Sequence, residues 1–280
     1  MPLTAARYGK ERVRILRLAR DGDHHVPREL TLSVMLSGTF DAAWTAGDNR
    51  SCIATDSVKN IVNVTAARNP TLDAESFVSA VAQVLLDTYP QITAVAIEAE
   101  ETRWQRHSVE GVAHGHTFTR DGNGCGYVGL AVDRAATTLR SGLRGFTFMK
   151  TTQSGWVGFV DDQYRTLPDT TDRIAATSMD ATWSWAVKPA DYETVNGRIL
   201  ALLLKVFGTT YSRGIQDSMY RMGEAALAAV PELADIAFVM PNKHYVPIDL
   251  KPFGLDDAAA VFQPTDEPYG RIEATIGRGR

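Results

Sequence analysis

One order of strands and helices occurs twice in this chain and constrains its fold more than any other feature of the sequence. In each half, two runs with strand periodicity precede two runs with helix periodicity, and further strand-like runs follow. A repeat of order at about half the chain length indicates a duplicated unit. We predict an α+β fold of two tandem units, residues 1–135 and 136–280, each an antiparallel sheet with two helices on one face.

The expected elements follow from apolar periodicity and from turn and cap residues. In the first unit we expect strands over 11–20, 30–40, 95–97, 112–120 and 127–132, and helices that begin at Thr55 and near Thr71 or Asp73. In the second unit we expect strands over 139–151, 174–185, 236–240, 245–250 and 271–276, and helices capped by Asp191 and Ser212.

The uncovered face of such a sheet is expected to carry aromatic residues such as Trp183 and Trp185. A monomer would leave these side chains and the sheet edges exposed to water. We therefore expect a homo-oligomer, in which other copies of the chain close the sheet.

Composition narrows the class of protein. The chain has 280 residues, 44% of them hydrophobic, and a net charge of -4 with acidic and basic residues interspersed. This favours a folded protein with a small-molecule ligand over a nucleic-acid binder. Because we find no signal-peptide pattern, membrane span or peroxisomal signal, we expect a soluble cytoplasmic protein. The two cysteines, Cys52 and Cys125, suggest no disulfide framework and receive no role.

A polar segment follows the second expected strand. Within Leu36–Val64, a Gly47-Asp48-Asn49 turn is followed by Thr55-Asp56-Ser57 and then by apolar residues at helical spacing. Thr55 and Asp56 are therefore expected at a helix N-terminus, where unpaired N–H groups favour an anion or a small polar ligand. The same three residues are also an ordinary N-cap sequence.

Four other polar residues interrupt the pattern. Lys10 precedes the first expected strand, Arg173 begins a later one, Gln216 lies in the first turn of a helix, and His244 lies in an expected tight connection over 241–244. A guanidinium offers a planar donor pair to a heterocycle, and an imidazole can act as acid or base. A solvated surface group is the ordinary interpretation of Lys10, and it is an alternative for each of the other three residues.

Several stretches together resemble the urate oxidase (uricase) family nearly end to end. They are YGK at Tyr8–Lys10, GDN and ATDSVKN within Leu36–Val64, KTTQSGWVGFVDDQYRTLPDTTDRI at Lys150–Ile174, IQDSMYRMG at Ile215–Gly223, MPNKHYVPIDLKPFG at Met240–Gly254, and PYGRIEATI at Pro268–Ile276. Each is weak alone, but six in family order are a strong signal.

The resemblance implies the tunnelling fold, with two such units per chain and a homotetramer that encloses a tunnel as an oligomeric barrel. It also implies that urate reacts with O2 and water to give 5-hydroxyisourate and hydrogen peroxide, with no metal and no cofactor. This reaction belongs to purine degradation.

The resemblance also assigns residues. It implies a proton relay of Lys10, Thr55 and His244. Arg173 and Gln216 would grip the edge of the heterocycle, Asn242 would hold O2 or water over the ring, and Asp56 and Ile215 would donate main-chain N–H groups to the substrate. The site would lie at a subunit interface, with Lys10, Thr55 and Asp56 from one chain and the other residues from its neighbour.

The sequence departs from the family pattern at a few positions. Trp156 stands where a phenylalanine usually stacks on the purine, Arg165 replaces a usual threonine, and Ile61 and Asn63 replace a usual threonine and aromatic residue. An indole preserves stacking but changes the depth of the pocket. The alternative substrate is therefore another oxidisable heterocycle, such as a methylated urate or another oxopurine.

Two further alternatives belong to other functional classes. His114 and His116 resemble the His-x-His motif of zinc-dependent pterin enzymes of the same fold, and strand alternation would place both imidazoles on one face. Structural histidines are the simpler interpretation. A protein that binds purines without turnover is the other alternative, and the presence of all the relay residues disfavours it.

Overall fold

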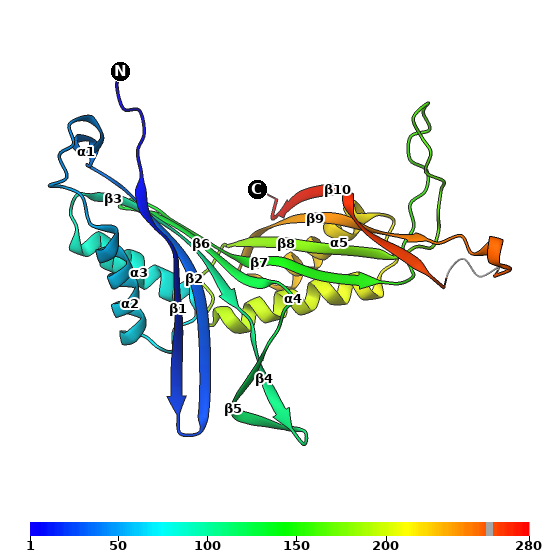
Figure 1. The fold of residues 1–280 in the computed structure, drawn as a ribbon, viewed down its shortest axis with the longest axis horizontal. Helices are drawn as coiled ribbons and strands as arrows, with labels where there is room; N and C mark the ends of the chain where they lie inside the picture. The colour runs from blue at the N-terminus through cyan, green and yellow to red at the C-terminus, as the bar shows by residue number, and fades with distance from the viewer. Residues whose placement is uncertain (256–259, 280) are drawn as a thin grey trace. The chain divides into compact units, whose positions relative to one another are not determined.

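The chain folds into two compact units, Met1–Gly142 and Leu143–Arg280, in a computed structural model that describes residues 1–255 and 260–279 (Figure 1). Each unit has its own cluster of buried apolar side chains. Each also has the order strand, strand, helix, helix, strand, strand, once two short insertions in the first unit are set aside.

The first unit is an antiparallel sheet in the order β1-β2-β3-β6, covered by two helices. Its elements are β1 (Tyr8–Asp21), β2 (His24–Gly38), α1 (Asp41–Thr45), α2 (Thr55–Arg68), α3 (Ala74–Thr88), β3 (Ile92–Thr102), β4 (Trp104–Val109), β5 (Val112–Arg120) and β6 (Cys125–Asp133). β4 and β5 form a separate hairpin, and β7 (Thr137–Lys150) runs from the first unit into the second.

The alternation in β2 identifies the core face. Leu30, Leu32, Val34 and Leu36 are at most 1% exposed, and they pack against residues of α2 and α3 such as Val62. Burying one such side chain is worth about 1.5–3 kcal/mol. The face predicted from the sequence is confirmed.

The second unit has the strand order β7-β8-β9-β10 with α4 and α5 packed against it (Figure 1). Its elements are β8 (Ala175–Trp185), α4 (Tyr192–Thr209), α5 (Ile215–Ala229), β9 (Leu233–Pro247), the 3-10 turn η1 (Lys251–Phe253) and β10 (Phe262–Gly277). β9 pairs antiparallel with both β8 and β10.

The prediction that Trp183 lies on an uncovered face is wrong. Trp183 is 1% exposed, and its indole N–H donates to Asn196 of α4 at 3.0 Å. Trp185 is half-buried against Tyr192. The residues that alternate with them along β8 are mostly polar: Ser178, Asp180, Thr182 and Ser184. The face away from the helices is therefore polar, because the larger apolar side chains of the strand turn toward the helices.

The first unit has the same polarity. On the face away from its helices, Ser33 of β2 pairs with Glu98 of β3, and Thr31 pairs with Glu100. β1 and β10 each have one neighbouring strand among the described residues, so each has an edge without a partner strand there. None of the helices in the described ranges is long and apolar enough to cross a bilayer.

Candidate active site

The Tyr8-Gly9-Lys10 segment is fixed at the start of β1. The Tyr8 hydroxyl accepts a hydrogen bond from the main-chain N–H of Ile53 at 2.7 Å, which ties the strand to the approach to α2. A Cβ at Gly9 would lie 1.9 Å from the carbonyl oxygen of Val34, so only glycine fits between the strands. Both contacts fix the backbone on which Lys10 stands.

A β-bulge follows Lys10. The pairing register of β1 with β2 shifts between Lys10 and Val13, and Arg12 has φ of 55°. A bulge bends a strand and re-aims the adjacent side chains.

Hydrogen bonding from Lys59, with a smaller effect of the Lys10 charge, lowers the pKa of the Asp56 carboxyl. Lys59 is therefore the main partner of the Asp56 carboxylate.

Thr55 and Asp56 lie at a helix N-terminus as predicted, but they do not cap it. α2 begins at Thr55, its N-cap residue is Ala54, and no side chain makes a cap hydrogen bond. The Asp56 carboxylate instead pairs with Lys59 and accepts from the Asn60 amide at 3.0 Å. The N-cap interpretation is wrong, and the main-chain donors of this first turn have no capping side chain.

The N-terminus of α5 is also uncapped, and the predicted Ser212 cap is wrong. The N-cap residue is Gly214, with φ of 151°. The Ser212 hydroxyl contacts the Ser218 hydroxyl at 2.6 Å and donates to the Gly214 carbonyl at 3.1 Å. Ile215 is buried and Gln216 is exposed at the start of this helix.

Trp156 packs at the start of α5. A Cβ at Gly214 would lie 2.7 Å from Cζ3 of Trp156, so the indole needs a glycine there. Trp156 exchanges main-chain hydrogen bonds with Thr170 at 2.7 and 3.0 Å, and the Arg173 N–H donates to the Ser154 carbonyl at 2.8 Å. These main-chain hydrogen bonds hold Trp156, the predicted stacking residue, and Arg173, the predicted guanidinium, in the same loop segment.

A cavity of about 760 Å³ in the second unit is lined by Arg173, Asn242 and His244 among other residues. The prediction of a tight turn over 241–244 is wrong, because β9 continues to Pro247. Asn242 and His244 alternate in phase with Phe238 and Met240, which are buried in the core. The strand face that buries core residues thus presents polar side chains further along.

One residue that lines this cavity, Arg173, has a buried Nε with no hydrogen-bond partner in the described part of the chain. The buried hydroxyls of Ser154, which accepts the Arg173 N–H at its carbonyl, and of Thr177 also lack a partner there. Burial also lowers the pKa of the Arg173 guanidinium. An unpaired buried donor is costly, and a ligand with acceptor groups would satisfy it. Thr177, which pairs with Asn242 across β8 and β9, was missed in the sequence, where it stands within an apolar run of one strand face.

The structure thus divides the predicted residues into two groups. Lys10, Thr55 and Asp56 belong to the first unit, and Trp156, Arg173, Ile215, Gln216, Asn242 and His244 belong to the second. No hydrogen bond joins Lys10 to Thr55 within the described ranges.

Comparison with known proteins places the chain in a family. The sequence profile of the family described as Uricase matches residues 6–127 and 139–273. The chain is 36% identical to the uricase of Arthrobacter globiformis over 97% of this chain and 88% of that protein. This chain belongs to the uricase family.

Other members of the uricase family are similarly related. The chain is 35% identical to the uricase of Aspergillus flavus over 98% of this chain and 96% of that protein. The crystal structure of uricase from Arthrobacter globiformis superposes with a TM-score of 0.93 over 99% of this chain and 95% of that chain, at 36% identity. The urate oxidase of Bacillus sp. TB-90, at 22% identity and a TM-score of 0.84, shares the fold. The tunnelling fold predicted from the resemblance is confirmed.

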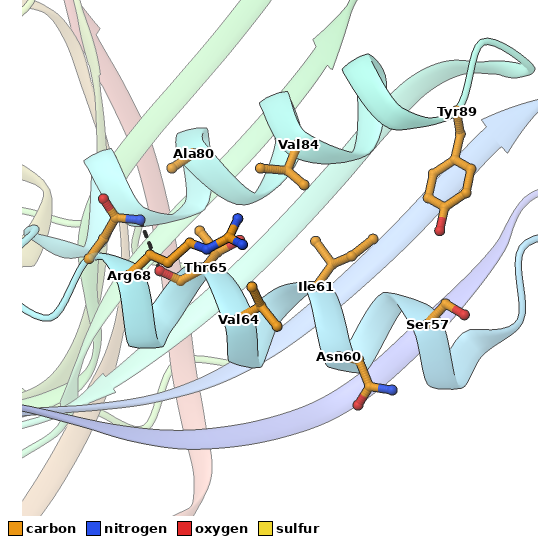
Figure 2. A pocket seen from close by; sticks show the side chains of 10 residues that line it. Ser57, Asn60, Ile61, Val64, Thr65, Arg68, Ala80, Val84 and Tyr89 are labelled. Atoms are coloured by element: carbon orange, nitrogen blue, oxygen red, sulfur yellow. Dashed lines mark hydrogen bonds between the residues drawn. The ribbon is translucent and has the colours of Figure 1, made fainter.

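The uricase fold of this chain also carries a smaller cavity, about 350 Å³, between α2 and α3. Its lining includes Ile61 and Val64 of α2, Val84 of α3, and Tyr89, with Arg68 at one end (Figure 2). None of the predicted site residues lines it.

The zinc alternative receives no support from the described residues. The rings of His114 and His116 lie 4.5 Å apart, and Nδ1 of His114 accepts the main-chain N–H of His116 at 3.3 Å. No group of three or more potential metal ligands occurs in the described ranges, and neither Cys52 nor Cys125 is in a disulfide. The two histidines interact with each other as structural residues do.

Proposed function

We propose that this chain oxidises urate with O2 and water to 5-hydroxyisourate and hydrogen peroxide, without a metal or cofactor. The observation that carries the proposal is the cavity in which Arg173, with a buried and unpaired Nε, lies with Asn242 and His244. A planar anion with ring carbonyls supplies the acceptors that this guanidinium lacks. Membership of the uricase family makes urate the first choice for that anion.

Each predicted residue has a role in this proposal. Lys10, Thr55 and His244 relay protons, so that the bound urate loses a proton and the peroxide leaves protonated. Asn242 holds O2 or water over the ring, and Trp156 stacks on it. These groups fix the reactants in position, which is the main requirement for a substrate that is itself easily oxidised.

The main-chain donors of the two uncapped helices complete the binding site. We assign the N–H of Asp56, in the first turn of α2, and the N–H of Ile215, the first residue of α5, to the heterocycle. A helix N-terminus stabilises negative charge nearby. Gln216 and Arg173 then grip the edge of the ring.

We further propose that the site forms between two copies of the chain in a homotetramer that encloses a tunnel. Lys10, Thr55 and Asp56 would come from the first unit of one copy, and the remaining residues from the second unit of its neighbour. The edges of β1 and β10, which have no partner strand among the described residues, and the polar sheet faces of both units support this arrangement. Edge pairing with other copies closes the sheets, and a polar face suits a water-filled interior.

The test follows urate absorbance and peroxide release together, with purified protein, a chelator and no added cofactor. Equal amounts of urate lost and peroxide formed support the proposal. A folded protein that leaves urate unchanged contradicts it and favours the alternative substrate, a methylated urate or another oxopurine fitted to the larger Trp156 ring. Loss of activity with the chelator, restored by zinc, would contradict the metal-free reaction. Size-exclusion chromatography with light scattering tests the tetramer.

A further inference from the structure

A loop of mostly exposed residues extends from Trp156. The main-chain bonds between Trp156 and Thr170 close this loop, and within residues 157–169 only Phe159 and Arg165 are partly buried. An exposed segment of this kind has high conformational entropy, so any fixed ring in it needs specific contacts.

An aromatic stack connects these residues. The rings of Trp156 and Phe159 are 5.6 Å apart between centroids, with 15° between their planes. Cζ of Arg165 lies 4.1 Å from the centroid of the Phe159 ring. Phe159 therefore occupies one face of the indole and is itself covered by a cation, which a ring quadrupole attracts. The opposite face of the indole is the one that we assign to the substrate.

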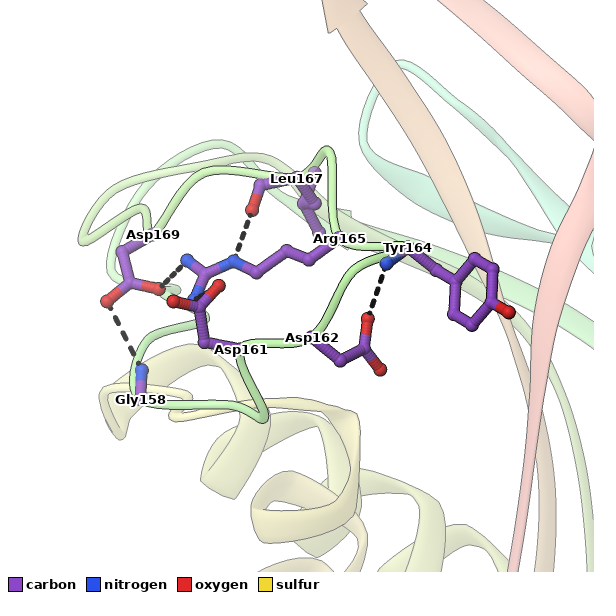
Figure 3. Close-up of polar contacts among 7 residues, drawn as sticks. All are labelled: Gly158, Asp161, Asp162, Tyr164, Arg165, Leu167 and Asp169. Carbon is purple, nitrogen blue, oxygen red and sulfur yellow. Dashed lines mark hydrogen bonds and ion pairs between the residues drawn. The ribbon is translucent and has the colours of Figure 1, made fainter.

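Several contacts hold the Arg165 guanidinium in place (Figure 3). Nη2 lies 2.6 Å from Oδ1 of Asp169, Nη1 lies 3.6 Å from Oδ1 of Asp161, and Nε donates to the Leu167 carbonyl at 2.9 Å. A planar guanidinium with partners on separate nitrogens has little freedom to rotate. Asp169 also accepts the main-chain N–H of Gly158 at 3.3 Å, which ties the two sides of the loop together.

We propose that Arg165 is a positioning residue that, through Phe159, holds the Trp156 ring in the orientation that stacks on the substrate. The inference rests on the proposed function, in which Trp156 stacks on the heterocycle. The two departures from the family pattern in this loop, Trp156 and Arg165, both contact Phe159. A larger stacking ring on an exposed loop needs an additional anchor, and Arg165 provides it.

The expected effect of losing Arg165 is on binding. A preorganised ring binds the substrate and the transition state alike, so its disorder raises KM and leaves kcat unchanged. Arg165→Thr should raise KM for urate by about 3- to 10-fold, the range that one aromatic contact supplies. Arg165→Lys keeps the charge without the planar fork and should give a smaller rise.

Matched variants in the same loop separate this effect from loss of charge. Asp169→Asn removes an anchor of Arg165, whereas Asp162→Asn removes an equal charge from a residue that accepts the Tyr164 N–H at 2.9 Å and makes no side-chain contact with the Arg165 guanidinium. KM should rise with Asp169→Asn and not with Asp162→Asn. In a Phe159→Leu background, Arg165→Thr should have no further effect, because the connecting ring is gone.

A second readout follows Trp156 directly. The chain has 5 tryptophans, so emission of the wild type minus that of Trp156→Phe isolates this ring. Arg165→Thr should increase acrylamide quenching of the difference emission, and Asp162→Asn should leave it unchanged. Unchanged quenching, or equal KM effects with and without Phe159, would overturn the inference. If quenching rises but KM stays constant, the positioning of Trp156 holds and its stacking on urate is wrong. If the wild type does not oxidise urate, the quenching comparison still decides the positioning.

Discussion

The four long helices of this chain begin in two different ways. α3 and α4 have side-chain caps: Asp73 accepts the Ser76 N–H at 2.6 Å, and Asp191 accepts the Thr194 N–H at 3.0 Å. α2 and α5 have no side-chain cap: the N-cap residue is Ala54 in α2 and Gly214 in α5. The uncapped helices are those whose first turns carry predicted substrate contacts.

The difference separates stability from binding. A side-chain cap contributes about 1 kcal/mol to a helix. α2 and α5, like the capped helices, are stabilised by buried residues such as Val58, Val62, Met219 and Met222, each worth about 1.5–3 kcal/mol. Packing can thus replace a cap, and the free N–H groups remain available for a ligand.

The largest expected effect is that of Thr55→Ala at the open end of α2. Loss of the relay hydroxyl should lower kcat by about 100-fold or more, the usual contribution of positioned proton transfer. The melting temperature should not fall, because Thr55 makes no cap bond and alanine favours a helix. Ser57→Ala, in the same turn, is the control and should retain turnover. Equal losses in both variants would contradict the relay.

Adding a side-chain cap to the N-terminus of α2 should have the next largest effect. Ala54→Ser places a hydroxyl at the N-cap position, where it accepts the N–H of the second or third helical residue. The melting temperature should rise, while KM for urate rises by about 10-fold as the new cap competes for the Asp56 donor. Steady-state kinetics and thermal unfolding measure the two effects. A stabilised variant with unchanged KM would show that this donor does not bind the substrate.

Removing a cap from the closed helices should have the opposite outcome. Asp73→Ala and Asp191→Ala should each lower the free energy of unfolding by about 1 kcal/mol. Turnover per folded molecule should stay the same, because neither residue is near the predicted site residues in sequence or in its contacts. Differential scanning fluorimetry and urate kinetics test this pair. A strong loss of turnover without loss of stability would contradict the inference that the capped helices serve stability and the uncapped helices serve binding.

The smallest expected effect concerns pH. The hydrogen bond from Lys59 lowers the pKa of Asp56, so the associated stability is present above the pKa of the unfolded chain and is lost as pH falls through the lowered value. Lys59→Met should raise the Asp56 pKa toward its ordinary value, as measured by carboxyl NMR. Stability at neutral pH should hardly change, because both groups are on the surface. An unaltered Asp56 titration would mean that Lys59 is not its partner in solution.

Much of the fold could be predicted from local patterns. The alternation in β2, the start of a helix near Asp73 and the Asp191 cap were predicted correctly, since each depends on residues close in sequence. The turn predicted over 241–244 failed because β9 pairs on both sides there, with Thr177 of β8 and Gly270 of β10 each opposite Asn242. Pairing on two sides overrides a local turn signal. The β4 strand was also missed.

The site was predicted only by resemblance to a family, apart from the helix N-terminus at Thr55. From local sequence alone, Arg173, Gln216 and His244 could each also be interpreted as solvated surface residues without a function. In the structure, Arg173 and His244 line the same cavity. The buried Thr177 hydroxyl, which has no hydrogen-bond partner among the described residues and whose residue pairs with Asn242, could not be predicted from the sequence. Unpaired polar atoms are recognised only once their surroundings are known.

The sequence by itself determined the duplicated order of strands and helices, the core face of β2 and the Asp191 cap of α4, because alternation and capping are short-range. Only the tertiary structure decided which helix ends stay open. The Tyr8 hydroxyl holds the Ile53 N–H just before α2, and the Trp156 ring requires Gly214 just before α5. The N-cap position of α2 therefore lies one residue before Thr55, and that of α5 lies two residues after Ser212, because packing between distant segments fixes where the chain enters each helix.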